Sequence, residues 1–183
     1  MIVQATDFEG FYNISQNCYD QRDLELYIQD FEEEYLCKLL GPALSNALTI
    51  ELEDNGGVLP PASRFEPLFA KMCLGCADNT CCCKSKKADV GYSIGLKKVL
   101  LGFIYYDYVI QQHHQNSQTG FVNNQNEAST PVSNLNITRL AEQRYNRSVD
   151  SAKAIQDYIN KNLTTYPEFQ GYCHFTHKFY PLL

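Results

Sequence analysis

The strongest feature of the hydrophobic pattern lies between Gly95 and Gln112, in the stretch GLKKVLLGFIYYDYVIQQ. Its apolar residues fall on two helical stripes, and a helix that is apolar on two sides has to be buried. Lys97, Lys98 and Asp107 keep the apolar run shorter than the roughly 20 residues that a membrane-spanning helix needs. The pattern therefore predicts a buried central helix, with Leu96, Val99, Leu100, Phe103 and Ile110 on one stripe and Leu101, Ile104, Tyr105, Tyr108 and Val109 on the other.

Two helices are predicted before the central one, joined at Gly41 and Pro42. Either Asp20 or Asp23 can cap the first helix, Gly41 suits its end, and Pro42 suits the first position of a second helix that runs to about Asp54. The first helix turns one face to the core and its charged face to solvent. The core positions are Leu24, Ile28, Phe31, Tyr35 and Leu39, the solvent positions are Glu25, Glu32, Glu33 and Lys38, and the second helix contributes Leu44, Leu48 and Leu52.

Two further helices are predicted, one directly before the central helix in the sequence and one after it. A third helix from about Ala62 to Leu74 places Phe65, Leu68, Phe69 and Met72 inward. The last helix, from about Val132 to Leu163, has a charged outer face and an apolar inner face. That inner face contains Ile137, Ala141, Tyr145, Val149, Ala152, Ile159 and Leu163.

The remaining segments lack helical spacing. Residues 1–19 are interpreted as an N-terminal arm with one short strand, and residues 166–183 as an aromatic C-terminal arm. Residues 113–131 are polar and too long for an ordinary connection, so they are expected to form a protruding mobile loop, or a β-hairpin built on Phe121 and Val122. The prediction is a mainly α fold, a small helical bundle of residues 20–165 around one buried central helix, with extended arms.

The protruding loop and the C-terminal arm are the predicted contact surfaces. Aromatic anchors in extended segments are typical of docking between proteins. For the C-terminal arm an alternative stays open, namely that it folds back on its own helices. The candidate contact residues are Phe121, Val122, Tyr166, Pro167, Phe169, Tyr172, Phe175, Phe179 and Tyr180.

Composition narrows the classes of function. The formal net charge is −6, which argues against a sequence-independent grip on nucleic acid, because such binding uses clustered lysine and arginine. No secretory signal pattern opens the chain, so its 8 cysteines are expected to be reduced or metal-bound. No phosphate-binding glycine loop, nucleophile elbow or His-Glu-x-x-His pattern occurs, and the chain is not expected to be an enzyme.

One cysteine-rich stretch has the residue types of a metal site. Thiolates two residues apart can share one face of a tetrahedral zinc ion, as in Cys73-x-x-Cys76, and Cys81 and Cys83 follow closely. The four together are a candidate zinc site, which with the basic residues of Lys84 to Lys98 would form a small regulatory or nucleic-acid-binding module. A metal-free cysteine-rich surface loop and an unusual disulfide are the alternatives.

Several phrases of the sequence resemble those of a known family. They are DFEEEYLCKLLGPALSNAL, GLKKVLLGFIYYDYV, NEAST, RYNRSVDSAKAIQDYI and YPEFQG. Together they resemble the small helical head-to-tail connector proteins of tailed phages, above all those of phages of gut Bacteroidetes, including crAss-like phages. The likeness extends from about Asp20 to Gly171 and includes no catalytic signature.

The resemblance implies a structural virion protein of the phage neck, assembled in the host cytoplasm. About a dozen copies are then expected to form a closed ring, joining the portal protein to the next neck or tail ring. The genomic DNA would pass through the ring without specific binding, and no membrane is involved. Without a metal, no cofactor is expected.

Overall fold

The computed structural model describes residues 1–14, 21–74, 91–113, 115–117, 120–122 and 134–171. Within these ranges the chain is mainly α-helical, as predicted. The helices are α1 (Gln21–Leu40), α2 (Pro42–Asp54), α3 (Glu66–Phe69), α4 (Leu96–His113) and α5 (Asn134–Lys161). Two small antiparallel pairs accompany them, β1 (Met72–Leu74) with β2 (Gly91–Ser93) and β3 (Gln115–Ser117) with β4 (Gly120–Val122).

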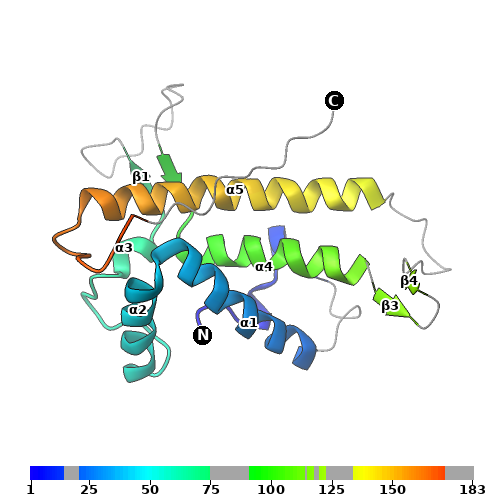
Figure 1. Cartoon of the computed structure of the whole chain (residues 1–183), viewed down its shortest axis with the longest axis horizontal. Coiled ribbons are helices and arrows are strands. Elements are labelled where there is room, and N and C mark those ends of the chain that lie inside the picture. The colour runs from blue at the N-terminus through cyan, green and yellow to red at the C-terminus, as the bar shows by residue number, and fades with distance from the viewer. Residues whose placement is uncertain (15–20, 75–90, 114, 118–119, 123–133, 172–183) are drawn as a thin grey trace.

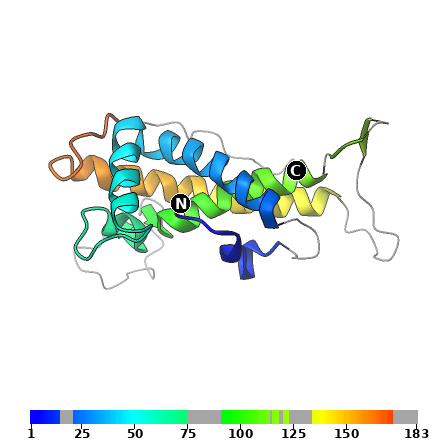
Figure 2. The ribbon, with the colours of Figure 1, turned by 90° about the horizontal axis from the view of Figure 1, so that it is seen from below.

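The predicted central helix is α4, and it is the centre of the fold. It lies antiparallel and side by side with α5, while α1 packs across it (Figures 1 and 2). Most of its side chains are buried because both stripes have a partner, α1 on one side and α5 on the other. The buried residues are Leu96, Val99, Leu100, Leu101, Phe103, Ile104, Tyr105 and Tyr108.

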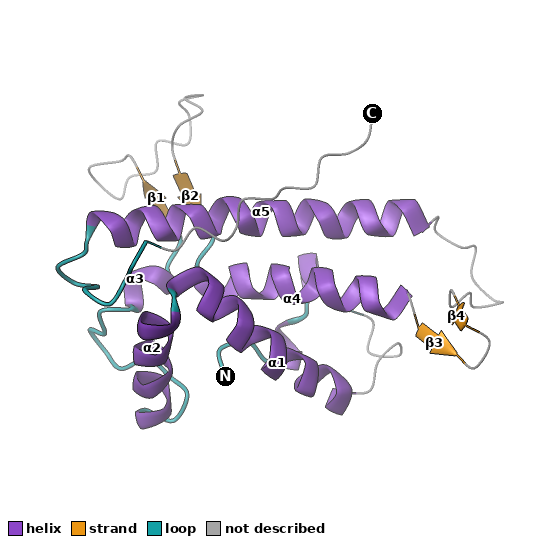
Figure 3. Ribbon diagram, in the orientation of Figure 1, coloured by secondary structure: helices purple, strands orange, loops and turns teal. Residues whose placement is uncertain are grey.

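Helices α1 and α2 begin and end where the sequence predicts them. Gly41 has a φ of 79°, a left-handed conformation that favours glycine, and Pro42 follows as the first residue of α2. The chain therefore turns sharply, and α2 runs across the long axis of the α4 and α5 pair (Figures 1 and 3). Leu44, Leu48 and Leu52 are buried, as their spacing predicts.

The prediction of a third helix from about Ala62 to Leu74 is mostly wrong. Only Glu66–Phe69 are helical, although Phe65 and Leu68 are buried as expected. Ala62 has a positive φ of 62°, and Met72–Leu74 pair in register with Ser93, Tyr92 and Gly91. Strand pairing with a segment so far along the chain leaves no trace in local helical spacing, so the pattern could not predict it.

The N-terminal segment packs on the body of the protein. It forms two 3₁₀ turns, η1 (Ala5–Asp7) and η2 (Gly10–Tyr12), and no strand occurs within residues 1–14. Val3, Phe8 and Tyr12 are buried in the same core as α1 and α4. Residues 1–14 are therefore part of the helical body.

Close approaches fix the position of α4. Gly95, directly before the helix, has a φ of 92°, and a Cβ there would lie 2.3 Å from the carbonyl oxygen of Phe69. Within the helix, a Cβ on Gly102 would lie 2.0 Å from the Ser148 hydroxyl oxygen of α5. Glycine thus allows α4 to approach both the end of α3 and the face of α5.

Serines connect β2 to α5. The hydroxyl of Ser151 accepts a hydrogen bond of 2.8 Å from the Ile94 backbone N–H and lies 3.1 Å from the Ser93 hydroxyl, which accepts the Gly95 N–H at 3.0 Å. Buried hydroxyls of this kind are stable because every one has a partner. The predicted inner face of α5 is buried at Ala141, Val149, Ala152 and Ile159, and exposed at Leu163.

No helix in the described ranges has the length and apolar character to cross a membrane.

Candidate interaction surfaces

The β3–β4 hairpin is the first candidate surface. It follows α4 directly and projects beyond the neighbouring ends of α4 and α5 in both views (Figures 1 and 2). Phe121 pairs with Asn116, and Val122 pairs with Gln115. Of the two alternatives predicted for this loop, these strands form the β-hairpin. It contains Phe121 and Val122, as that alternative predicts.

The C-terminal aromatic segment begins inside the core, so the prediction is wrong for two of its residues. Tyr166 and Phe169 are buried, and the Tyr166 hydroxyl donates a hydrogen bond of 2.6 Å to the carbonyl oxygen of Arg64. Its ring packs near Phe65, and burial raises the pKa of Tyr166 to about 12. Two such side chains cannot serve as contacts for another protein, and residues 166–169 belong to the helical body.

An ion pair fixes the same segment. The Arg64 guanidinium donates to both carboxylate oxygens of Glu168, at 3.1 and 2.9 Å, and this hydrogen-bonded partner lowers the pKa of Glu168. Pro167 lies between the two anchored positions and is exposed. The other predicted contact residues of this arm lie outside the described residues, namely Tyr172, Phe175, Phe179 and Tyr180.

The structure places one of the four candidate zinc ligands. Cys73 is half-buried in β1, opposite Tyr92, and Cys76, Cys81 and Cys83 lie outside the described residues. Among the residues that are described, no group of three or more His, Cys, Asp or Glu side chains is arranged to hold a metal ion. The zinc site therefore stays a prediction.

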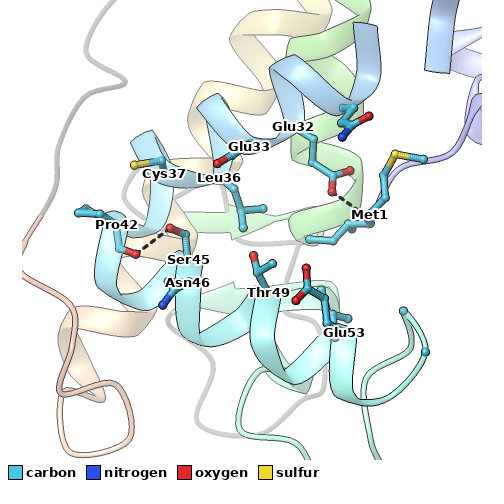
Figure 4. A pocket seen from close by; sticks show the side chains of 15 residues that line it. Met1, Glu32, Glu33, Leu36, Cys37, Pro42, Ser45, Asn46, Thr49 and Glu53 are labelled. Atoms are coloured by element: carbon cyan, nitrogen blue, oxygen red, sulfur yellow. Dashed lines mark hydrogen bonds between the residues drawn. The ribbon is translucent and has the colours of Figure 1, made fainter. Parts of the chain in front are cut away.

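An open groove of about 840 Å³ lies between α1, α2 and the first residues of the chain (Figure 4). Leu36 of α1 and Thr49 and Glu53 of α2 point toward one another across it. The 15 residues that line it include Glu32, Glu33 and Glu53 and no lysine, arginine or histidine. We call it the acidic groove.

Glu32 departs from its predicted place on the solvent face. It is buried, and its two carboxylate oxygens accept hydrogen bonds of 2.7 Å from the backbone N–H groups of Ile2 and Val3. Burial is the largest influence on its pKa and raises it, although the two hydrogen bonds act in the opposite direction. A signal was present in the sequence, because Glu32 continues the four-residue spacing of the buried residues Leu24, Ile28, Leu36 and Leu40.

A second carboxylate lies between α1 and α4. Asp107 accepts a hydrogen bond from the Tyr35 hydroxyl, and the Tyr35 ring stacks on Phe103 with centroids 4.8 Å apart. Burial raises the pKa of Asp107, and burial with the aspartate hydrogen bond raises the pKa of Tyr35. The pair joins two core helices, so we interpret it as structural.

Comparison with known proteins gives one match. The sequence profile of DUF6712, a family of unknown function, matches residues 88–178, which contain α4, α5 and both hairpin strands β3 and β4. No curated protein and no solved structure matches the chain significantly.

Proposed function

We propose that this protein is a ring-forming structural component of a phage neck, a head-to-tail connector that joins the portal protein to the tail. The observation that carries the proposal is the β3–β4 hairpin, which projects from the end of an otherwise helical body (Figure 1). A short projecting hairpin has strand edges whose backbone groups can pair with a neighbouring chain. It gives each copy a way to reach the next protein in a stack.

Three sequence features support the same proposal. Three of the phrases that resemble phage connectors lie mostly in α1, α2, α4 and α5, the long helices of the body. The net charge of −6 suits a channel protein, because an acidic wall repels the DNA backbone and lets it slide. The sequence also contains 13 Tyr and 10 Phe, and aromatic residues are enriched at interfaces.

The proposed partners are other copies of this chain, the portal protein, and the next ring of the neck or tail. Genomic DNA passes through the channel without specific binding. The protein is assembled in the host cytoplasm and remains in the virion.

Native mass spectrometry and electron microscopy of the untagged protein test the proposal, first alone and then mixed with its portal. A closed ring, alone or on the portal, is the expected result. A protein that neither closes into a ring nor binds the portal contradicts it. A zinc-loaded monomer would instead favour the cysteine-based regulatory module, and the same mass spectrum reports bound metal.

A paired variant tests the role of the hairpin. Replacing Phe121 and Val122 by serine is expected to abolish portal binding and to leave the helical circular dichroism signal unchanged, because both residues lie outside the helices. Leu163→Ser is the matched control, since Leu163 is an exposed apolar residue just after α5, away from the hairpin. Equal binding by the hairpin variant and the control would remove the hairpin from the proposal.

A further inference from the structure

A second groove lies on the other side of the N-terminal segment. Met1 and Ile2 line the acidic groove, whereas Asp7, Glu9, Phe11 and Tyr12 line this second groove of about 620 Å³. Its remaining wall comes from Phe69 and Lys71, from Ile94, and from the first turns of α4, which contribute Lys97 and Lys98. We call it the basic groove.

Two arginines add positive charge beside this groove. The guanidinium of Arg144 lies 4.8 Å from the centre of the Phe11 ring, and that of Arg147 lies 5.5 Å from it. Arg144 is also 4.3 Å from the ring centre of Tyr105, so it lies against two aromatic rings. Cations over aromatic rings are attracted to them, and these contacts hold Phe11 in place on the surface.

Phe11 is therefore an exposed aromatic side chain with two arginines against its ring. Its side chain is 53% exposed although it is large and apolar. An exposed aromatic ring that is already held in place is suited to anchor an interface, because it is buried at little entropic cost when a partner binds. Single exposed apolar residues are common. Phe11 therefore marks an interface only if another surface of the protein complements it.

The acidic groove has the complementary properties. Its rim contains Glu33 and Glu53, and Ile2, Leu36 and Leu52 give it apolar lining. The basic groove and the two arginines beside it contain five basic residues and two acidic ones, Asp7 and Glu9. Asp7 pairs with Lys97 at 2.8 Å. The basic residues are Lys71, Lys97, Lys98, Arg144 and Arg147. The two surfaces thus have opposite net charge, and both have apolar lining.

We propose that the acidic groove of one copy receives Phe11 and the surrounding basic side chains of a second copy. The inference rests on the proposed function, because it assigns the two surfaces by which neighbouring subunits of the ring meet. Each copy uses one surface toward one neighbour and the other surface toward the next. Contacts between two different patches of identical chains are heterologous, and they produce a closed ring when the rotation between copies closes.

The observations favour a second copy over nucleic acid as the ligand of the basic groove. The whole chain is acidic, with a net charge of −6, and Asp7 and Glu9 line the groove itself. A polyanion, with one charge on every phosphate, would meet more repulsion from both than the few carboxylates of the acidic groove do. The acidic groove, in contrast, is present on every copy and supplies the charge that the basic groove lacks.

Charge reversal with mixing tests the contact. The first variant carries Glu33→Lys and Glu53→Lys, and the second carries Lys71→Glu and Lys98→Glu; all four side chains are exposed, so both variants are expected to fold. Each variant alone is expected to lose assembly, because like charges would face each other in every contact. An equimolar mixture is expected to restore it, since every contact in an alternating ring is then complementary.

Cross-linking of the wild-type protein gives a second, independent readout. A carbodiimide joins lysine to carboxylate side chains in direct contact, and mixing isotope-labelled with unlabelled protein identifies links between copies. Links from Lys71 or Lys98 to Glu33 or Glu53 between copies are expected, and their absence both from concentrated protein and from protein assembled on its portal overturns the proposal. Phe11→Ala is expected to weaken assembly by roughly tenfold or more as a lost interface anchor, with Leu163→Ser as its control.

The outcomes separate this inference from the function on which it rests. If the wild-type protein forms a ring, alone or on its portal, while both reversed variants assemble normally, the assigned contact is wrong and the connector proposal stands. If the mixture gives only a closed pair of chains, the ring contact is overturned in favour of a two-fold dimer. If single-stranded DNA binds the basic groove and does not inhibit assembly, the basic groove is not an assembly contact. Its ligand is then nucleic acid, and the inference is wrong.

Discussion

The carboxylate of Glu32 accepts a hydrogen bond of 2.7 Å from the backbone N–H of Val3, which lies 29 positions earlier in the chain. Its other oxygen accepts the N–H of Ile2 at the same distance. One side chain of α1 thus satisfies two backbone donors that would otherwise be buried without partners. This arrangement attaches the N-terminal segment, which separates the acidic and basic grooves, to the helical body.

Removing this carboxylate should loosen the N-terminal segment. Glu32→Ala leaves two buried N–H groups without an acceptor and is expected to lower the free energy of unfolding by about 2–3 kcal/mol, the usual effect for hydrogen bonds to a charged group. Amide hydrogen exchange at Ile2 and Val3 should increase at the same time. Glu33→Ala is the control, because Glu33 is its exposed neighbour, and equal effects from both variants would contradict the assigned role.

The half-buried Asp107 should make stability depend on pH. Burial raises its pKa above the ordinary value of 3.8, so between that value and the raised one the folded state holds the proton more than the unfolded state does. The free energy of unfolding therefore falls as pH rises through this window. Asp107→Asn, whose amide oxygen can still accept the Tyr35 hydrogen bond, is expected to flatten this dependence and to increase stability at neutral pH.

Chemical denaturation of wild type and Asp107→Asn at a series of pH values checks this prediction. The series runs from about pH 4 to about pH 8, so that it includes the range in which carboxyl groups with raised pKa values titrate. Asp157→Asn on the exposed face of α5 serves as the control for the loss of one negative charge. Parallel stability curves for all three proteins would show that Asp107 does not titrate differently on folding.

The approach of α4 to α5 at Gly102 should not tolerate a side chain. Gly102→Ala places a Cβ against the Ser148 hydroxyl and is expected to reduce the free energy of unfolding by about 1–3 kcal/mol, as overpacked cores do. Adding Ser148→Ala removes the contacting oxygen and should recover part of the loss. A double-mutant cycle measures this coupling, and simple additivity of the two substitutions would mean that they do not meet.

Tyr166 should behave as a core residue. Tyr166→Ala removes a fully buried ring and its hydrogen bond to the Arg64 carbonyl, so a loss of about 3–5 kcal/mol in the free energy of unfolding is expected. Thr164→Ala, at an exposed position nearby, should leave stability almost unchanged. Thermal unfolding of the two variants decides the point, and a Tyr166→Ala protein as stable as the control would return this residue to the contact surface.

Local spacing was sufficient to predict the long helices, and it failed where distant segments meet. The bounds of α2, and the buried face of α4, follow from the positions of leucine, glycine and proline. The pairing of Met72–Leu74 with Gly91–Ser93 and the acceptor role of Glu32 both depend on partners far along the chain. Those partners cannot be recognised from the periodicity of one segment.

The candidate surfaces show the same division. A hairpin built on Phe121 and Val122 was one of two alternatives that the sequence left open for the polar loop, and local spacing could not decide between them. The aromatic character of Tyr166 and Phe169 suited an anchor in a partner and an anchor in the core equally well, and only the position of Arg64 decides between these. The grooves were not predictable, because each combines residues from at least three separate segments.

The contacts of Arg64 also set an order of events during synthesis. Arg64 binds the Glu168 carboxylate 104 positions later, and its carbonyl accepts the Tyr166 hydroxyl 102 positions later. A chain that leaves the ribosome from its N-terminus has made α1 and α2 long before these partners appear. The surface around Arg64 and Phe65 therefore lacks these partners while more than half of the protein is translated. The native core is complete only after residue 169 has emerged.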